Sequence, residues 1–381
     1  MRRAMMVLTM QWALIAPAYA AGPTVVSTLE VELNDWHDGL GDEGTQLATV
    51  VAVAATAPDW RLGISTGYVR AEARSDVPDF RGSVTTPLDT VVSASFRGLK
   101  TKVAGRSLQF SVDGDLSLPT GKSRLGGRQR NVIFDPLLAR YDRYGEGLNY
   151  SAGVGAALAL TDTLSFALAG RFTRTGKYHP DADSPDVEID PGDTPAIGGH
   201  LVWQRGSDLL SFGVEVADEE VARRNGARLL DRGRSLELSV SAVAGVAPGW
   251  TLTGTALYSH RRKDRRLNEV TGELELEQGR LSGDIWAAAA SVYRQILPRT
   301  ELGLEADYAS IGDSEIDDAD FSYLPARRRW RLGIGMKHRA NSRLSLTAAA
   351  RYVDYRDRGS SLLLPLNAAG VNVTFGVSNA F

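Results

Sequence analysis

Polar and apolar residues alternate along most of the chain. Between Leu108 and Leu118 every second position is apolar or glycine, and glutamine, serine or aspartate stands between. A period of two over about ten residues predicts a β-strand with one apolar face. We count sixteen such segments, beginning near residues 24, 45, 60, 89, 107, 148, 164, 195, 209, 235, 250, 284, 300, 328, 343 and 368. The pattern predicts an all-β protein.

The connections between these segments alternate in length. Seven are tight turns, at 58–59, 97–100, 161–163, 206–208, 248–249, 297–299 and 340–342. Eight are long and polar, at 36–44, 75–88, 119–147, 176–194, 217–234, 261–283, 310–327 and 356–367. Transmembrane barrels have short turns at one rim and longer loops at the other, and an even number of strands. We therefore expect a transmembrane up-and-down antiparallel β-barrel of about sixteen strands, within a range of about fourteen to eighteen.

Aromatic residues stand where the strands are expected to end. Trp60 and Trp250 follow short turns in phase with the apolar face. At the loop ends the same phase is held by Tyr68, Phe172, Tyr258, Tyr308 and Tyr352. Rings at both ends of an apolar face predict the aromatic girdles of a membrane barrel.

The first twenty residues have the pattern of a secretory signal. Arg2 and Arg3 precede an apolar stretch that ends at Ala18-Tyr19-Ala20, which is a small-residue cleavage site. The stretch is shorter than the roughly 20 residues of a bilayer-spanning helix. We therefore expect a signal peptide over 1–20 and a single barrel domain over 21–381.

Composition narrows the function. Loss of Arg2 and Arg3 with the signal leaves 41 basic and 46 acidic residues, a net charge of −5. A mildly acidic chain is not expected to bind nucleic acid. The absence of cysteine excludes disulfides, thiol catalysis and cysteine metal sites.

The last segment alternates to the final residue, Phe381, with Val371, Val373, Phe375 and Val377 on one face. This ending resembles the C-terminal signature of Gram-negative outer-membrane porin-like proteins. The resemblance implies a location in the cell outer membrane, with lipid and lipopolysaccharide as neighbours. It also implies the barrel-assembly machinery as a partner, with Phe381 as the assembly signal.

A second, shorter likeness lies at Ser117-Leu118-Pro119-Thr120-Gly121-Lys122 with Leu125-Gly126-Gly127. It resembles the strand-to-loop passage of barrels that serve as transporters of aromatic-degradation pathways. It implies a conduit for aromatic compounds.

The polar face should line a water-filled lumen, and it carries charge. The expected pore-lining residues on the strands are Asp113, Asp115, Arg171, Glu301, Glu305, Arg329, Arg331 and Arg351. Acids on one strand and arginines on the next allow two interpretations. Unlike charges on facing walls would polarise the pore and select permeants, whereas neighbouring columns would pair as salt bridges that brace the wall.

The third external loop is the longest, and it combines basic residues with the apolar pieces Val132-Ile133-Phe134 and Leu137-Leu138. Apolar loop residues require burial. The loop is expected to fold into the lumen and present Arg128 and Arg130 at a constriction, which resembles the third-loop constriction of general porins. The alternative is an external flap that packs on other loops or on a second subunit.

Catalysis, metals and cofactors are not expected. The five histidines have no metal-ligand spacing, and no serine motif accompanies His200, which should face the lumen. Thr120-Gly121-Lys122-Ser123 lacks the upstream glycine of a phosphate-binding loop, since Leu116 stands there.

The first hypothesis for function is a passive diffusion channel for small hydrophilic solutes, with a homotrimer as in many porins. The alternative is a dedicated conduit for a hydrophobic or aromatic nutrient, or for polysaccharide secretion. A third class is a non-conducting barrel that acts as an adhesin or assembly partner.

Overall fold

The computed structural model describes residues 23–381 except 269, 282, 321–322 and 362–364. The expected signal peptide lies outside the described residues. The wall of the molecule is built from β1 (Thr24–Asp38), β2 (Glu43–Thr56), β3 (Trp60–Arg74), β4 (Gly82–Pro87), β5 (Thr90–Val103), β6 (Arg106–Leu118), β7 (Asn149–Ala159), β8 (Leu164–Thr175), β10 (Thr194–Arg205), β11 (Asp208–Ala217), β14 (Ser235–Ala247), β15 (Trp250–Arg261), β18 (Ile285–Leu297), β19 (Thr300–Ile311), β20 (Arg327–Arg339), β21 (Leu344–Asp357) and β22 (Asn367–Ala380).

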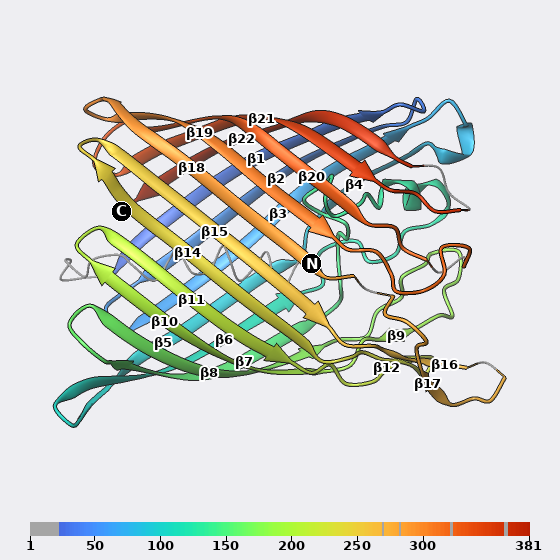
Figure 1. The fold of residues 1–381 in the computed structure, drawn as a ribbon, viewed down its shortest axis with the longest axis horizontal. Helices are drawn as coiled ribbons and strands as arrows, with labels where there is room; N and C mark the ends of the chain where they lie inside the picture. Colours follow the sequence, from blue (N-terminus) through green and yellow to red (C-terminus); the bar gives the residue numbers. More distant parts are fainter. Residues whose placement is uncertain (1–22, 269, 282, 321–322, 362–364) are drawn as a thin grey trace.

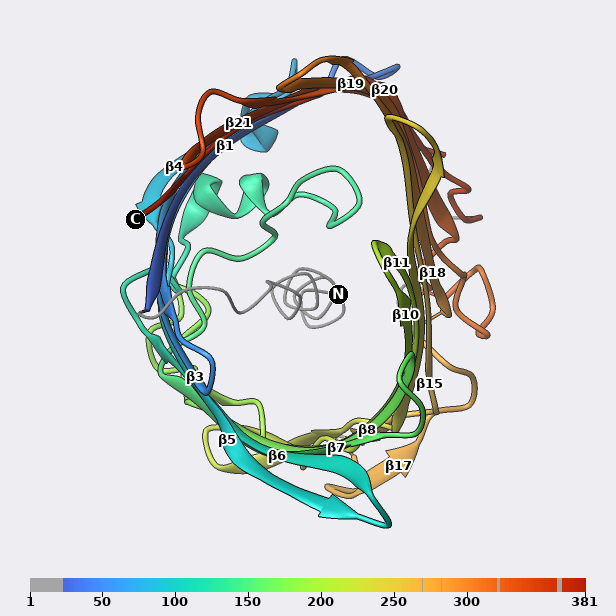
Figure 2. The same cartoon turned by 90° about the vertical axis from the view of Figure 1, so that its left-hand side faces the viewer.

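These strands close on themselves. Each pairs antiparallel with its neighbours in chain order, and β1 pairs with β22, so that Val31 lies opposite Phe375. β4 and β5 both pair with β3, at its loop half and its turn half respectively. β4 and β5 therefore share one strand position in the wall, and the seventeen strands of the sheet fill sixteen strand positions. The sheet is a closed antiparallel barrel (Figures 1 and 2), which confirms the predicted fold class.

The outer face of the barrel is apolar. Leu304, Leu332 and Ile334 are 60 %, 65 % and 64 % exposed, and every second residue of most strands follows the same pattern. Exposing such surface to water would cost roughly 25 cal/mol per Å², whereas contact with lipid removes that cost. The band is therefore the lipid-facing surface of a membrane-spanning barrel.

Aromatic rings border this band at the loop end. Tyr258 lies 4.5 Å from Trp286 and Tyr308 lies 4.5 Å from Trp330, measured between ring centroids. Tyr68 and Tyr352 are also exposed on this face. The predicted girdle at the loop ends is confirmed, and the chain is a membrane-spanning β-barrel.

The predicted turn at 97–100 is wrong. β5 continues to Val103, and the chain reverses at Ala104 and Gly105, which both have positive φ, at 49° and 77°. The pairing of β5 with β6 shifts register between Phe96 and Leu99. A β-bulge in the middle of a hairpin interrupts the alternation of side chains, which is why this segment resembles a turn in the sequence.

Short elements lie outside the wall at the loop end. A five-stranded sheet joins the fourth, fifth and sixth external loops and contains β9 (Ile189–Asp190), β12 (Ala222–Arg224), β13 (Ala227–Asp231), β16 (Arg265–Leu267) and β17 (Leu274–Leu276). Two 3-10 helices are η2 (Pro78–Phe80) and η3 (Gly127–Val132). No helix among the described residues is long and apolar enough to cross a bilayer.

Candidate functional site

The inner face of the barrel surrounds a cavity of about 1470 Å³ in the half of the lumen that lies nearer the long loops. Its wall is formed by inward residues of strands around the barrel, such as Ser65, Thr253, Ser291 and Thr374. These alternate with the lipid-facing residues because successive side chains of a strand point to opposite faces. The lumen is therefore lined by groups that hydrogen-bond with water.

The third external loop, residues 119–148, which we call L3, lies inside the barrel. Figure 2 shows this segment, in green-blue, within the ring of strands. Its residues Pro136 and Leu138 to Tyr144 contribute to the lining of the cavity. The structure thus places the loop in the lumen rather than in an external flap.

Apolar residues from both halves of L3 pack on the wall beside β2, β3 and β4. Val132, Phe134 and Tyr144 join a buried cluster with inward-facing wall residues, among them Ala48, Val69, Ala71 and Val84. The Phe134 ring meets Trp36 edge to face, with 5.5 Å between centroids. Burial of these side chains contributes roughly 1.5–3 kcal/mol each.

The tip of L3 reaches a second part of the wall. Leu137 and Leu138 are buried with Tyr355 of β21 in a further apolar cluster. Two polar contacts fix the same segment, because Arg329 Nη1 donates to the Leu137 carbonyl at 2.7 Å and Arg327 pairs with Asp135 at 3.0 Å. L3 therefore bridges two separate regions of the inner wall.

Both ends of L3 leave the wall beside the break between β4 and β5. Asp89, between β4 and β5, accepts hydrogen bonds from the Gly121 and Glu146 N–H groups, both at 2.8 Å. The backbones of Gly121 and Gly145 touch here, and a Cβ on Gly121 would lie 1.9 Å from the Tyr144 carbonyl oxygen. Only glycine fits such an approach. We call this arrangement the neck of L3.

The predicted charge columns on β19, β20 and β21 are joined by salt bridges. Arg329 and Arg331 both pair with Asp307, at 2.8 and 2.7 Å, and Arg351 pairs with Glu305 at 2.5 Å. The pairing arises because these strands are adjacent and in matching register. The structure therefore shows the wall-bracing arrangement for these five residues.

Asn372 of β22 extends this network across the closure of the barrel. Its side chain is fully buried, accepts a hydrogen bond from Arg351 Nη1 at 2.6 Å and donates to Glu32 Oε1 at 2.9 Å. A chain of hydrogen bonds thus runs from β21 to β1. Such a network resists local opening because breaking it would leave buried polar groups without a partner.

Arg140 is the arginine of L3 that enters this network. It pairs with Glu30 and Glu32, the latter at 2.9 Å. Burial opposes the charge of Arg140, but the ionisable groups around it, Tyr141 and the two glutamates, outweigh burial and raise its pKa. Arg140 therefore stays charged and ties the loop to β1.

Four further predicted strand residues lie elsewhere on the lumenal face. Arg171 of β8 pairs with Asp113 at 3.2 Å and with Asp115, both on β6. Glu301 lies near the turn end, in register with Lys337 of β20. Glu301 is outside the lining of the cavity.

Arg128 and Arg130 lie at the external edge of L3 and not in the lining of the cavity. Arg130 pairs with Asp181 and Asp183 of the fourth external loop, both at 3.0 Å, and Arg128 lies 3.8 Å from Asp79. The arginines of L3 that line the cavity are Arg140 and Arg143.

The opposite wall carries unpaired acids. Glu215 of β11 and Glu237 of β14 lie side by side in register and both line the cavity. No ion pair joins either carboxylate to a basic side chain within the described ranges. The lumen is thus uneven in charge, with paired arginines on one side and free carboxylates on the other.

Sequence reasoning missed Asp89, Asp135 and Asn372. Asn372 was foreseeable, since it lies on the polar face of the last strand. Asp89 and Asp135 act through contacts with distant segments, and no local pattern marks them. The glycine and proline string at 119–121 was the one local signal of the neck.

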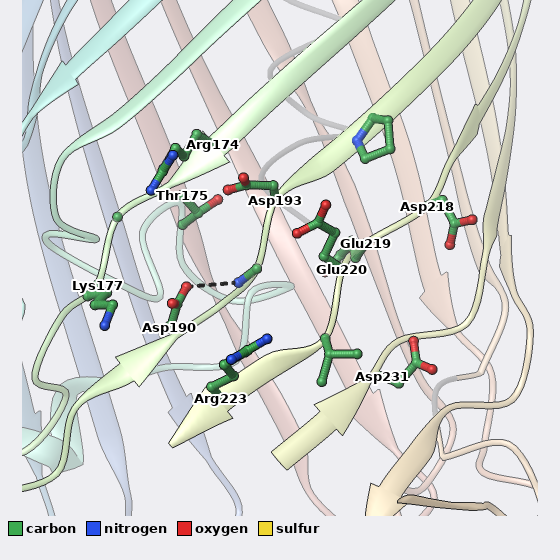
Figure 3. A pocket seen from close by; sticks show the side chains of 14 residues that line it. Arg174, Thr175, Lys177, Asp190, Asp193, Asp218, Glu219, Glu220, Arg223 and Asp231 are labelled. Carbon is green, nitrogen blue, oxygen red and sulfur yellow. Dashed lines mark hydrogen bonds between the residues drawn. The ribbon is translucent and has the colours of Figure 1, made fainter. Parts of the chain in front are cut away.

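A second pocket, of about 750 Å³, lies among the fourth and fifth external loops (Figure 3). Acids dominate its lining, including Asp190, Asp193 and Glu220, and the Gly192 N–H donates to Asp190 at 3.4 Å. Among the described residues, no three histidine, aspartate or glutamate side chains have the geometry to hold a metal ion.

Comparison with known proteins gives structural similarities only. No family model matches the chain, and no curated protein matches it. It is similar to the P. putida toluene transporter TodX, with 12 % identity over 95 % of this chain and 90 % of that chain and a TM-score of 0.40.

Two further solved structures are similar at the same level. The CymD monoaromatic hydrocarbon channel has 9 % identity over 94 % of this chain and 89 % of that chain, with a TM-score of 0.44. An outer-membrane channel from Pseudomonas putida F1 has 9 % identity over 96 % of this chain and 100 % of that chain, with a TM-score of 0.40. The function is therefore argued from the lumen of this chain.

Proposed function

We propose that this protein is an outer-membrane channel for the passive diffusion of small hydrophilic solutes. The observation that carries the proposal is the lumenal cavity of about 1470 Å³ with its charged and hydroxyl-bearing lining. A solute that moves along such a wall keeps its hydrogen bonds, so entry does not require the loss of its hydration. The apolar residues of L3 support this view, because most of them are buried against the wall.

The lining also supports a weak preference for cations. The cavity is lined by twelve carboxylates and ten guanidinium groups, an excess of two negative charges. Glu215 and Glu237 contribute to this excess, since neither has a basic partner among the described residues. Fixed charges in a narrow aqueous passage raise the local concentration of the opposite ion.

Single-channel recording of the purified protein in a planar bilayer tests the proposal. We expect stable conductance steps, and a reversal potential in a salt gradient that indicates modest cation selectivity. The variant Glu215→Gln/Glu237→Gln should shift the reversal potential toward anions. Glu273→Gln/Glu275→Gln, in and beside the external β17 segment, is the matched control and should leave it unchanged. Zero conductance would refute the proposal.

A conduit for hydrophobic or aromatic solutes is the second candidate. One observation favours it: Val50, Leu88 and Val91 form an apolar part of the cavity lining close to the interruption between β4 and β5. Uptake assays distinguish the two functions. Swelling of protein-containing liposomes in small sugars is expected for a hydrophilic channel, whereas faster uptake of toluene without sugar permeation would favour the conduit.

A further inference from the structure

A basic pocket lies at the external rim of the barrel. It has a volume of about 660 Å³ and is lined by six basic side chains, Arg232, Arg234, Arg262, Lys263, Arg265 and Arg280, against two acids, Asp218 and Asp231. The adjacent pocket in Figure 3 shares these two aspartates but is otherwise rich in acids. Positive charge is therefore concentrated at one place on the rim.

The phase of β15 places the His260 edge of this pocket on the lipid side of the wall, whereas Arg232 also lines the lumenal cavity. Ser259 and Arg261 line the lumenal cavity, so Tyr258 and His260 point outward. Tyr258 stacks near Trp286, which is 55 % exposed on the lipid-facing surface. His260 lines the pocket and is two residues further along the strand, about 7 Å along the strand axis, which for a strand tilted by about 40° is about 5 Å above the girdle. That height is the level of lipid head groups.

Some of the basic side chains have acidic partners. Arg234 pairs with Asp218 at 3.0 Å, and Arg280 pairs with Asp284 at 2.6 Å and with Glu315 at 2.8 Å. His260 also contacts Asp284, at 2.9 Å. These pairs neutralise one edge of the pocket and hold its shape.

The other edge keeps its charge. Within the part of the chain that the structure describes, no ion pair joins Arg262, Lys263 or Arg265 to an acid. Lys263 Nζ donates to the Gln278 carbonyl at 2.7 Å, which is a neutral acceptor. The neighbouring Asp264 is buried and accepts from the Gly233 N–H at 2.8 Å. Arg262 and Arg265 are exposed and free to bind.

We propose that this pocket binds the phosphate group of an outer-leaflet lipid. Guanidinium groups bind phosphate through paired, charge-assisted hydrogen bonds, which matches the arginine content of the pocket. The exposed Trp286 and the half-buried Tyr258 below it supply the apolar surface on which the acyl chains of the same lipid lie. The basic pocket lies above the aromatic surface, just as the phosphate of a membrane lipid lies above its acyl chains. This arrangement of the two features is what identifies a phosphorylated lipid as the ligand.

Calorimetric titration of the full-length protein in detergent micelles tests this site. The probes are diphosphoryl lipid A, the same lipid without its phosphates, and inorganic phosphate. Arg262→Gln/Arg265→Gln should weaken lipid A binding about tenfold or more through the loss of charge-assisted contacts. Arg223→Gln/Arg224→Gln removes the same charge from the exposed β12 and is the matched control, with lipid A affinity expected to stay within about twofold.

Three outcomes would overturn the proposal. Equal lipid A affinity of the two double variants would mean that the basic pocket is not the site. Equal affinity for dephosphorylated lipid would mean that acyl chains alone are bound, and equal affinity for inorganic phosphate would assign the pocket to a free anion. Conductance should be the same in both variants, since none of the four substituted arginines lines the lumenal cavity, so the test is independent of the proposed channel function.

Discussion

The neck of L3 makes a quantitative prediction about how firmly the loop is held in the lumen. Asp89→Ala removes the acceptor of two backbone N–H groups, those of Gly121 and Glu146. A hydrogen bond to a charged group contributes about 1.5–3 kcal/mol, so the loss of both should weaken docking by about 3 kcal/mol or more. Each 1.4 kcal/mol is a factor of about ten, which gives an increase of about a hundredfold in the undocked population. Asp89→Asn keeps one carbonyl acceptor and should raise that population about tenfold.

Thiol labelling measures this population directly. The chain has no cysteine, so Leu137→Cys introduces a single thiol at a position that is 0 % exposed when L3 is docked. When docking is fast relative to the chemistry, the rate of reaction with a hydrophilic maleimide is proportional to the undocked fraction. In this background we expect the labelling rate to rise about tenfold in Asp89→Asn and about a hundredfold in Asp89→Ala, relative to the protein with Asp89 intact.

The matched control is Asp79→Asn in the same background. Asp79 is 91 % exposed and lies 3.8 Å from Arg128 in an external loop, so its removal should leave the labelling rate unchanged. Equal labelling rates in the Asp89 series would refute the reasoning, because the apolar contacts of Phe134 and Leu138 would then hold L3 without the neck.

The remaining predictions concern the same wall and the assembly of the barrel. Gly121→Ala should raise labelling at position 137, because its Cβ would meet the Tyr144 carbonyl, whereas Gly39→Ala has open space and should not. Asp307→Asn leaves two arginines without a carboxylate, one of them buried, and should lower the free energy of unfolding in urea by about 3–5 kcal/mol; Asp59→Asn, at an exposed pair with Lys100, should change it by less than about 1 kcal/mol. If Phe381 is the assembly signal, its deletion should reduce the amount of folded protein in the outer membrane of cells while refolding in detergent stays normal, and equal loss in both assays would contradict that role.

The wall was predictable because its physical requirement is local. Each strand must present an apolar residue to lipid at every second position, so the pattern identifies a strand and its phase together. The observed starts of β1, β3, β8 and β15 coincide with the expected ones. The pattern failed at residues 97–100, where a bulge changes the phase in mid-strand and only the partner strand reveals the continued pairing.

The lumenal charges were predictable for the same reason, and the contacts of L3 were not. Once the phase is known, Glu305, Asp307 and the facing arginines must lie on one side of adjacent strands. A loop has no such period. Arg130 pairs with acids of another loop, and Arg140 reaches β1, because of three-dimensional proximity that the order of residues in L3 does not encode.

The contacts between L3 and the wall have a consequence for how the pore can change over evolution. Arg327 and Arg329 of the wall bind L3 through a salt bridge and a hydrogen bond. Glu30 and Glu32 of the wall form salt bridges with Arg140 of L3. Shortening the loop would therefore enlarge the opening, but it would also leave wall residues of both charge signs without their partners in L3. A lineage that widens this passage must replace wall residues on β1 and β20 in the same steps, so pore diameter and wall composition are inherited together.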